Sequence, residues 1–174
     1  MVQRVQVVAL GISLAIGAAL VTGLTLGSRQ APLHVGPTTL PGVELAEVYA
    51  TVVAYLAPPV PAGATGPNRV SVSRAIYDTC PPPAPGKLPS LCGRTKVGLL
   101  KPDIEAALVE ALARRGIHAV FGDPGDVQLH QVVTEQTGTP AVDGNAGDGS
   151  QMKFHFKPVN GRLQLQNVTV EWIK

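Results

Sequence analysis

A stretch without any charged side chain, from Val5 to Gly27, constrains this chain more than any other feature. As an α-helix it would be about 34 Å long, which matches the roughly 30 Å hydrocarbon core of a bilayer. Helices in the core of a globular domain rarely run so long without a polar face. The sequence therefore predicts that residues 5–27 insert into a membrane, and that residues 1–29 form an N-terminal anchor.

Retention of this anchor depends on the length of the apolar stretch and on the residues after it. A cleavable signal peptide usually has an apolar region of about 7–15 residues and then small residues at the cleavage site. The apolar stretch here is longer and is followed by no clear cleavage site, so we expect a single-pass membrane protein. Secretion after signal cleavage is the alternative. Arg4 precedes the stretch and Arg29 follows it, so the charge balance only slightly favours a cytoplasmic N-terminus.

Small residues within the same stretch allow a different role for it. Ala15 and Ala19, and likewise Gly23 and Gly27, have the small-xxx-small spacing with which transmembrane helices approach each other closely. One hypothesis is therefore a single-span subunit that recognises its partner within the membrane. Replacing Gly23 and Gly27 by Leu should then abolish assembly.

The only two cysteines enclose a proline-rich segment. Cys80 and Cys92 stand at the ends of CPPPAPGKLPSLC. Outside the cytoplasm such a pair predicts a disulfide, which would stabilise the fold by roughly 3 kcal/mol through the loop it closes. The constrained loop, with Lys87 and Leu88 near its middle, is a candidate contact surface.

The rest of the chain is predicted to form one domain over residues 42–174, joined to the anchor by a linker over residues 30–41. An apolar helical face over 43–56 predicts a first helix. The second begins at Pro102, and Gly116 follows it as a left-handed cap. Within this second helix we expect Glu110 to pair with Arg114.

Strand patterns surround these helices, at residues 69–77, 117–121, 127–135 and 151–157, with a last strand after the Asn160-Gly161 turn. In this last strand the apolar parity changes, which predicts a β-bulge near Gln166 and Asn167. Residues 137–150 are expected to form a Gly/Asp loop. The fold class is therefore α+β, with two helices packed on a mainly antiparallel sheet of four to five strands.

Alternation along residues 151–157 assigns two faces to that strand. Met152, Phe154 and Phe156 point one way, and Lys153, His155 and Lys157 point the other. We expect the second set to lie on a solvated sheet face, near His130, and to form a second candidate contact surface. Two histidines lack the third ligand that a zinc site needs, so the sequence predicts no metal.

Composition and motifs limit the functions that remain. The net charge of +2 and the 4% of aromatic residues argue against nucleic-acid binding, and no known catalytic or cofactor motif occurs. The segment from Asp143 to Asp148 resembles a calcium loop but fails its pattern. We therefore expect a non-catalytic, membrane-anchored extracytoplasmic domain that acts by protein or ligand contact and needs no cofactor.

An enzyme is the alternative to such a contact domain. A small secreted hydrolase or transferase would assemble its site from scattered residues such as Asp126, His130 and His155. This alternative requires that at least two of these side chains lie close together in a pocket.

Overall fold

A computed structural model describes residues 34–57, 60, 65–79, 95–135 and 137–172 of the chain. The chain divides into two units, Met1–Ala31 and Pro32–Lys174, and every element described here belongs to the second. The predicted anchor and the segment from Cys80 to Cys92 lie outside the described residues. Among the described residues, no helix has the length and apolar character needed to cross a bilayer.

Both predicted helices are present. Helix α1 spans Gly42–Leu56 and has Glu44 in its first turn, where the helix dipole favours a carboxylate. Helix α2 spans Pro102–Ala113 and begins with a proline, whose missing N–H has no intrahelical partner to lose. Gly116 follows with a φ of 73°, the left-handed conformation expected just after a helix end.

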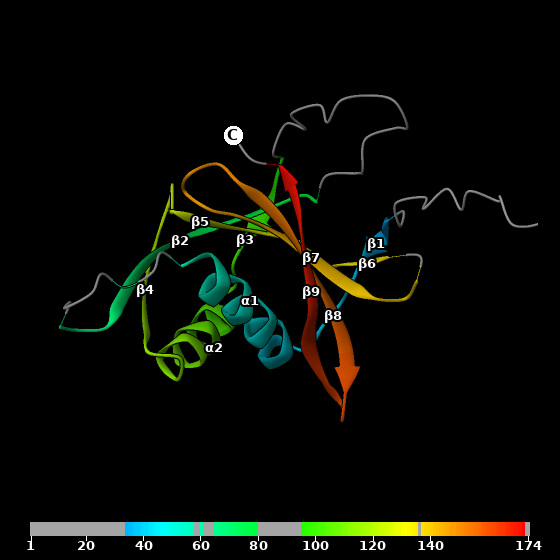
Figure 1. Cartoon of the computed structure of the whole chain (residues 1–174), viewed down its shortest axis with the longest axis horizontal. Helices are drawn as coiled ribbons and strands as arrows, with labels where there is room; N and C mark the ends of the chain where they lie inside the picture. The colour runs from blue at the N-terminus through cyan, green and yellow to red at the C-terminus, as the bar shows by residue number, and fades with distance from the viewer. Residues whose placement is uncertain (1–33, 58–59, 61–64, 80–94, 136, 173–174) are drawn as a thin grey trace, which may run out of the picture. The chain divides into compact units, whose positions relative to one another are not determined.

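Within the described residues, nine strands form one mixed, mainly antiparallel sheet (Figure 1), so the α+β class is confirmed and the expected number of four to five strands is wrong. Strand β2 pairs in parallel with β4 and β5, and the other pairs are antiparallel. The strands are β1 (His34–Pro37), β2 (Asn68–Tyr77), β3 (Lys96–Leu99), β4 (Ile117–Gly122), β5 (Val127–His130), β6 (Val133–Glu135), β7 (Pro140–Asn145), β8 (Gln151–Val159) and β9 (Arg162–Trp172).

The two helices lie side by side on one face of this sheet (Figure 1). Their apolar sides and the facing side chains of the sheet form one core. Its largest fully buried members are Phe154, Phe156, Leu108, Leu112 and Leu129. Phe154 and Phe156 come from β8, as their alternation predicts.

Strand β7 corrects the expectation of a loop over residues 137–150. Its composition is typical of a loop, yet residues 141–145 are all buried and pair with β8 along their whole length. Gly144 is required here, because a Cβ atom would lie 2.7 Å from Cγ1 of Val52 and 2.9 Å from Cδ1 of Leu56. A glycine that resembles a turn signal is therefore the place where α1 approaches the sheet.

Two further boundaries differ from the expectation. The run over residues 127–135 is not one strand, since β5 and β6 are separated at Gln131 and Val132, with Val132 in the helix-side core. Part of the expected linker, His34–Pro37, forms β1 and pairs with β6. Backbone pairing at a sheet edge leaves little trace in side-chain periodicity, which is why this short strand is missed.

The β8–β9 hairpin confirms the prediction at its turn and at its bulge. Asn160 and Gly161 have φ values of 50° and 74°, as a tight hairpin turn requires. His155 pairs with Asn167 and Phe156 with Leu165, so Gln166 is the extra residue. The bulge lets the apolar residues on either side of it face the same core.

Strand β2 pairs with both β4 and β5 because the segment that joins those two strands crosses over β2. Val72 of β2 pairs with Phe121 on β4 and with Val127 on β5, and residues 123–126 join these strands. A Cβ atom on Gly125 would lie 2.3 Å from the backbone nitrogen of Ser73, so the chain passes against the β2 backbone. The Asp123 carboxylate accepts a hydrogen bond from the Ser73 hydroxyl at 2.6 Å and secures the crossing.

Candidate functional site

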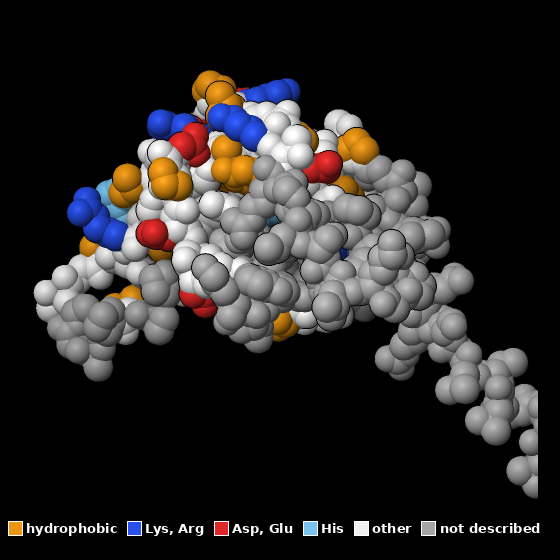
Figure 2. Space-filling view, turned by 90° about the horizontal axis from the view of Figure 1, so that it is seen from above, with side chains coloured by type: hydrophobic (Ala, Val, Ile, Leu, Met, Phe, Trp, Pro, Cys, Tyr) orange, Lys and Arg blue, Asp and Glu red, His pale blue; other side chains and the backbone are white. Residues whose placement is uncertain are grey.

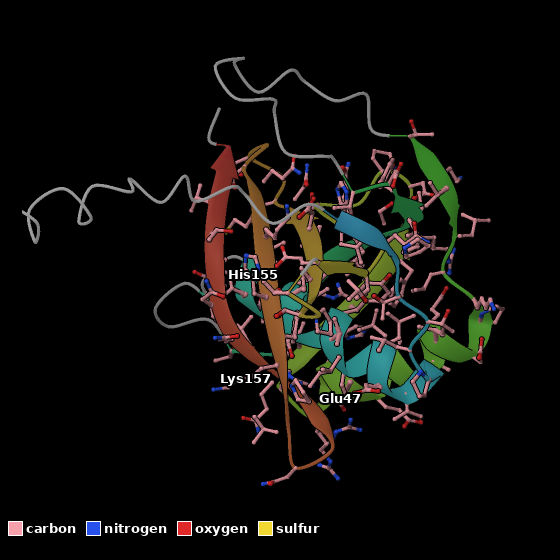
Figure 3. All side chains as sticks on the ribbon, turned by 90° about the vertical axis from the view of Figure 1, so that its right-hand side faces the viewer. Glu47, His155 and Lys157 are labelled. Carbon is pink, nitrogen blue, oxygen red and sulfur yellow. The ribbon has the colours of Figure 1, made fainter. Side chains whose placement is uncertain are left out.

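The sheet face opposite the helices is polar, but it is not solvated as expected. Lys153 is only 5% exposed, whereas Lys157, four residues further along β8, is exposed. Figure 3 shows His155 and Lys157 along this strand. The solvated-face expectation is therefore wrong for Lys153, and Lys157 is the exposed lysine of the pair.

Lys153 is buried with an acidic partner from the neighbouring strand. Asp143 of β7 is its register partner, and the Lys153 Nζ lies 3.8 Å from the Asp143 Oδ1. Gln151 donates from Nε2 to Oδ2 of the same carboxylate at 3.4 Å. Burial of a lysine requires such compensation, because an isolated buried charge is strongly unfavourable. Sequence reasoning misses the pair because it assigns Asp143 to a loop.

His155 joins a buried carboxylate to an exposed hydroxyl. Its Nδ1 lies 3.3 Å from Oε2 of Glu135 on β6, and its Nε2 lies 3.2 Å from the Thr169 hydroxyl on β9. Glu135 is 3% exposed, and its Oε1 has no hydrogen-bond partner within the part of the chain that the structure describes. This order of carboxylate, imidazole and hydroxyl is that of a general-base relay.

The other residues of the enzyme alternative have different neighbours. His130 is fully buried at the end of β5, where its Nδ1 lies 2.8 Å from the Asp78 carbonyl oxygen. The buried Tyr49 hydroxyl donates to the His130 carbonyl at 3.1 Å. Asp126 is exposed in the crossing segment. Each of the three predicted residues thus has its own surroundings, and the partners of His155 are ones that sequence reasoning does not name.

A groove of about 830 Å³ lies between the start of α1, the end of α2 and the β8–β9 turn. Its lining combines three arginines, two glutamates and several apolar or small residues. The residues are Pro41, Val43, Glu44, Glu47, Arg114, Arg115, Gly161, Arg162, Leu163 and Gln164.

One wall of the groove is organised by a carboxylate between two arginines. Glu47 accepts a hydrogen bond from Arg115 Nη2 at 2.8 Å on one oxygen and from Arg114 Nη2 on the other. The hydrogen bond from Arg115 is the largest reason why the pKa of the Glu47 carboxyl lies below its ordinary value. The sequence predicts that Arg114 pairs with Glu110, and this is wrong. Arg114 pairs instead with Glu47 of α1, because α1 lies beside the end of α2.

The opposite wall comes from the β8–β9 hairpin. Arg162 is exposed just after the turn, and Leu163 packs partly against the core. Val43, at the start of α1, is 73% exposed. Figure 3 labels Glu47 on α1 and His155 on β8, so the groove and the relay of His155 can be compared in one view.

This groove is the feature that sequence reasoning misses most completely. In the sequence, Glu47 lies near the start of one predicted helix, and Arg114 and Arg115 lie near the end of the other, where the helix dipoles favour such charges. The Arg162 position is visible as the residue after a tight turn. A single sequence does not indicate that α1, α2 and the β8–β9 turn meet, because hydrophobic periodicity relates only residues that are a few positions apart.

The predicted contact surface on the loop between the two cysteines cannot be placed. Cys80, Lys87, Leu88 and Cys92 lie outside the described residues. Within the described ranges, no group of three or more potential metal ligands occurs. On the face shown in Figure 2, basic, acidic and hydrophobic side chains of the described residues alternate over short distances.

Comparisons with known proteins give no family for this chain: no family model, curated protein or solved structure matches it.

Proposed function

We propose that this chain is a membrane-anchored, extracytoplasmic binding domain that acts by contact and not by catalysis. The anchor over residues 5–27 and the pair Cys80 and Cys92 motivate the location. The observation that carries the binding role is the groove between α1, α2 and the β8–β9 turn. Its volume lies within the range of small-ligand sites, and it combines apolar residues such as Val43 and Leu163 with five converging charged side chains.

Two lysines on β8 provide an internal test of the proposed location. Lys157 is exposed and Lys153 is 5% exposed. An amine reagent that cannot cross the cytoplasmic membrane should therefore modify Lys157 in cells whose cytoplasmic membrane is closed. Mass spectrometry of the digested protein locates the modification.

The buried lysine serves as the control for folding. Lys153 should stay unmodified until the protein is denatured, which shows that the reagent reached a folded domain. If Lys157 is modified only after the cytoplasmic membrane is opened, the domain faces the cytoplasm and the proposal fails.

A hydrolase is the second candidate, with the relay of Glu135, His155 and Thr169 in place of the predicted site of Asp126, His130 and His155, which the structure does not bring together. In such an enzyme His155 Nε2 would take the proton of the Thr169 hydroxyl as its oxygen attacks an acyl carbon, and Glu135 would stabilise the imidazolium formed. The leaving group would depart with a proton returned from His155. Hydrolysis of the acyl-threonine by water would then regenerate the hydroxyl.

A covalent probe separates the two candidates. A fluorophosphonate should label Thr169 in a hydrolase, and the nearly isosteric Thr169→Val variant should lose that label. A binding domain predicts no label at Thr169 in either protein. Labelling that depends on both Thr169 and His155 would therefore overturn the non-catalytic proposal.

A further inference from the structure

We propose that the groove binds a ligand that carries a single carboxylate on a short apolar body, such as a peptide C-terminus that ends in aliphatic residues. This inference rests on the proposed binding function and specifies its ligand. It is carried by three properties of the groove: hydrogen-bond donors that remain on its arginines, the balance of its charges and the apolar residues beside them.

The paired arginines retain donors beyond those that Glu47 uses. A guanidinium has five N–H donors in a rigid fork. Glu47 receives one hydrogen bond from Arg114 and one from Arg115, and a further nitrogen of Arg115 donates to the Ala111 carbonyl at 2.8 Å. Arg114 remains 60% exposed at its side chain. Glu47 thus holds two guanidinium groups in place while donors stay available to a second anion.

The charges of the groove favour a monoanion. Three arginines and two glutamates line it, which leaves one net positive charge. A single carboxylate neutralises that charge, whereas a doubly charged phosphate would also face the carboxylates of Glu44 and Glu47. Like charges within one groove disfavour binding, so the groove should favour a single carboxylate over a doubly charged phosphate.

Apolar residues next to the charges define the rest of the ligand. Val43 is 73% exposed at the start of α1, and Leu163 borders the groove from the hairpin. A ligand with a short aliphatic body would cover Val43 while its carboxylate meets the arginines. Burial of apolar surface on both partners would then contribute to affinity.

The direct test is a titration of the full chain, in micelles of a non-ionic detergent, with acetylated valyl-leucine. Chemical-shift changes in the nuclear magnetic resonance spectrum should appear at Val43 and Leu163 with the free acid. The C-terminal amide of the same peptide, which lacks the charge, should bind at least tenfold more weakly. Equal shifts from acid and amide, or no shifts from either, would overturn the carboxylate assignment.

Two variants with different expected effects make the test specific. Arg162→Gln should weaken binding of the acid by about threefold to tenfold, as the loss of one charge contact at an exposed arginine. Arg69→Gln, at an exposed arginine on β2 that does not line the groove, is the matched control and should leave affinity unchanged. An equal loss in both variants would indicate general charge attraction and overturn the site.

Glu47→Gln keeps an acceptor oxygen that can still hold a guanidinium in place but removes the negative charge that opposes the ligand carboxylate, so it should instead strengthen binding of the acid by a similar factor. Weaker binding to a folded Glu47→Gln protein would contradict the proposal. Failure of these titrations removes the ligand class alone, whereas the lysine modification described above tests the location independently.

Discussion

The two faces of β7 and β8 are built from alternate residues of the same strands, yet they differ in almost every physical respect. Toward the helices, Val142 and Phe154 are fully buried, and Tyr55 meets the Phe154 ring edge-on with centroids 5.3 Å apart. Toward the other side, Asp143 and Lys153 are nearly as inaccessible as Val142 and Phe154 but are charged. Burial alone therefore does not distinguish the two faces.

The difference lies in what each face contributes. Apolar burial on the helix side stabilises the fold in proportion to the area removed from water. Buried ion pairs contribute little net stability, because desolvation offsets their attraction, but the loss of one partner is costly. The helix face thus contributes most of the stability. On the polar face, the two members of an ion pair can be replaced together but not one at a time without loss of stability.

The largest expected effect comes from the helix face. Phe154→Ala removes a fully buried ring between β8 and α1 and should lower the free energy of unfolding by about 3–5 kcal/mol. Chemical denaturation of the full chain measures this value. Val170→Ala is the control on neighbouring β9, since Val170 is 55% exposed and its truncation should change stability by less than about 0.5 kcal/mol.

The polar face should show a smaller loss that a second substitution recovers. Lys153→Met removes the buried ammonium beside Asp143 and should cost about 3 kcal/mol. Replacing both members, Lys153→Met with Asp143→Leu, should restore most of this loss, because no buried charge of the pair then remains. If the double variant is less stable than the single one, the two faces do not differ in the way described.

Gly144 tests the close approach of α1 to β7. In Gly144→Ala the new methyl group would meet side-chain atoms of Val52 and Leu56 at 2.7 and 2.9 Å. These side chains must shift, so unfolding free energy should fall by about 1–3 kcal/mol. Additional replacement of Val52 by Ala should relieve part of the crowding. A Gly144→Ala protein as stable as the original would contradict the packing of α1 on β7.

The smallest effect should be one that depends on pH and involves neither face. The hydrogen bond from Ser73 is the main reason why the pKa of Asp123 is lowered. A lowered folded-state pKa adds stability that is complete above the ordinary value of about 4 and is lost as pH falls through the folded-state value. Asp123→Asn should therefore flatten the fall in thermal unfolding temperature below about pH 4, and an unchanged acid dependence would contradict this assignment.

The β8–β9 hairpin and β7 show what local sequence can and cannot predict. The hairpin is predictable because its turn residues, its alternation and its bulge are each encoded within a few positions. Strand β7 is not predictable, because Asp143 is buried there beside Lys153 of β8 and Gly144 is needed there beside Val52 of α1, and both partners are distant in sequence. The groove has the same character, since Glu47, Arg114 and Arg162 meet only through the tertiary fold.

The proposed membrane-anchored location outside the cytoplasm can be tested through the intact mass of the protein purified from the cells that naturally produce it, measured before and after reduction. A retained anchor and a disulfide between Cys80 and Cys92 predict the full-length chain, lighter by two hydrogen atoms before reduction. A full-length chain with both thiols free would contradict the extracytoplasmic location, and a shortened chain would contradict the retained anchor.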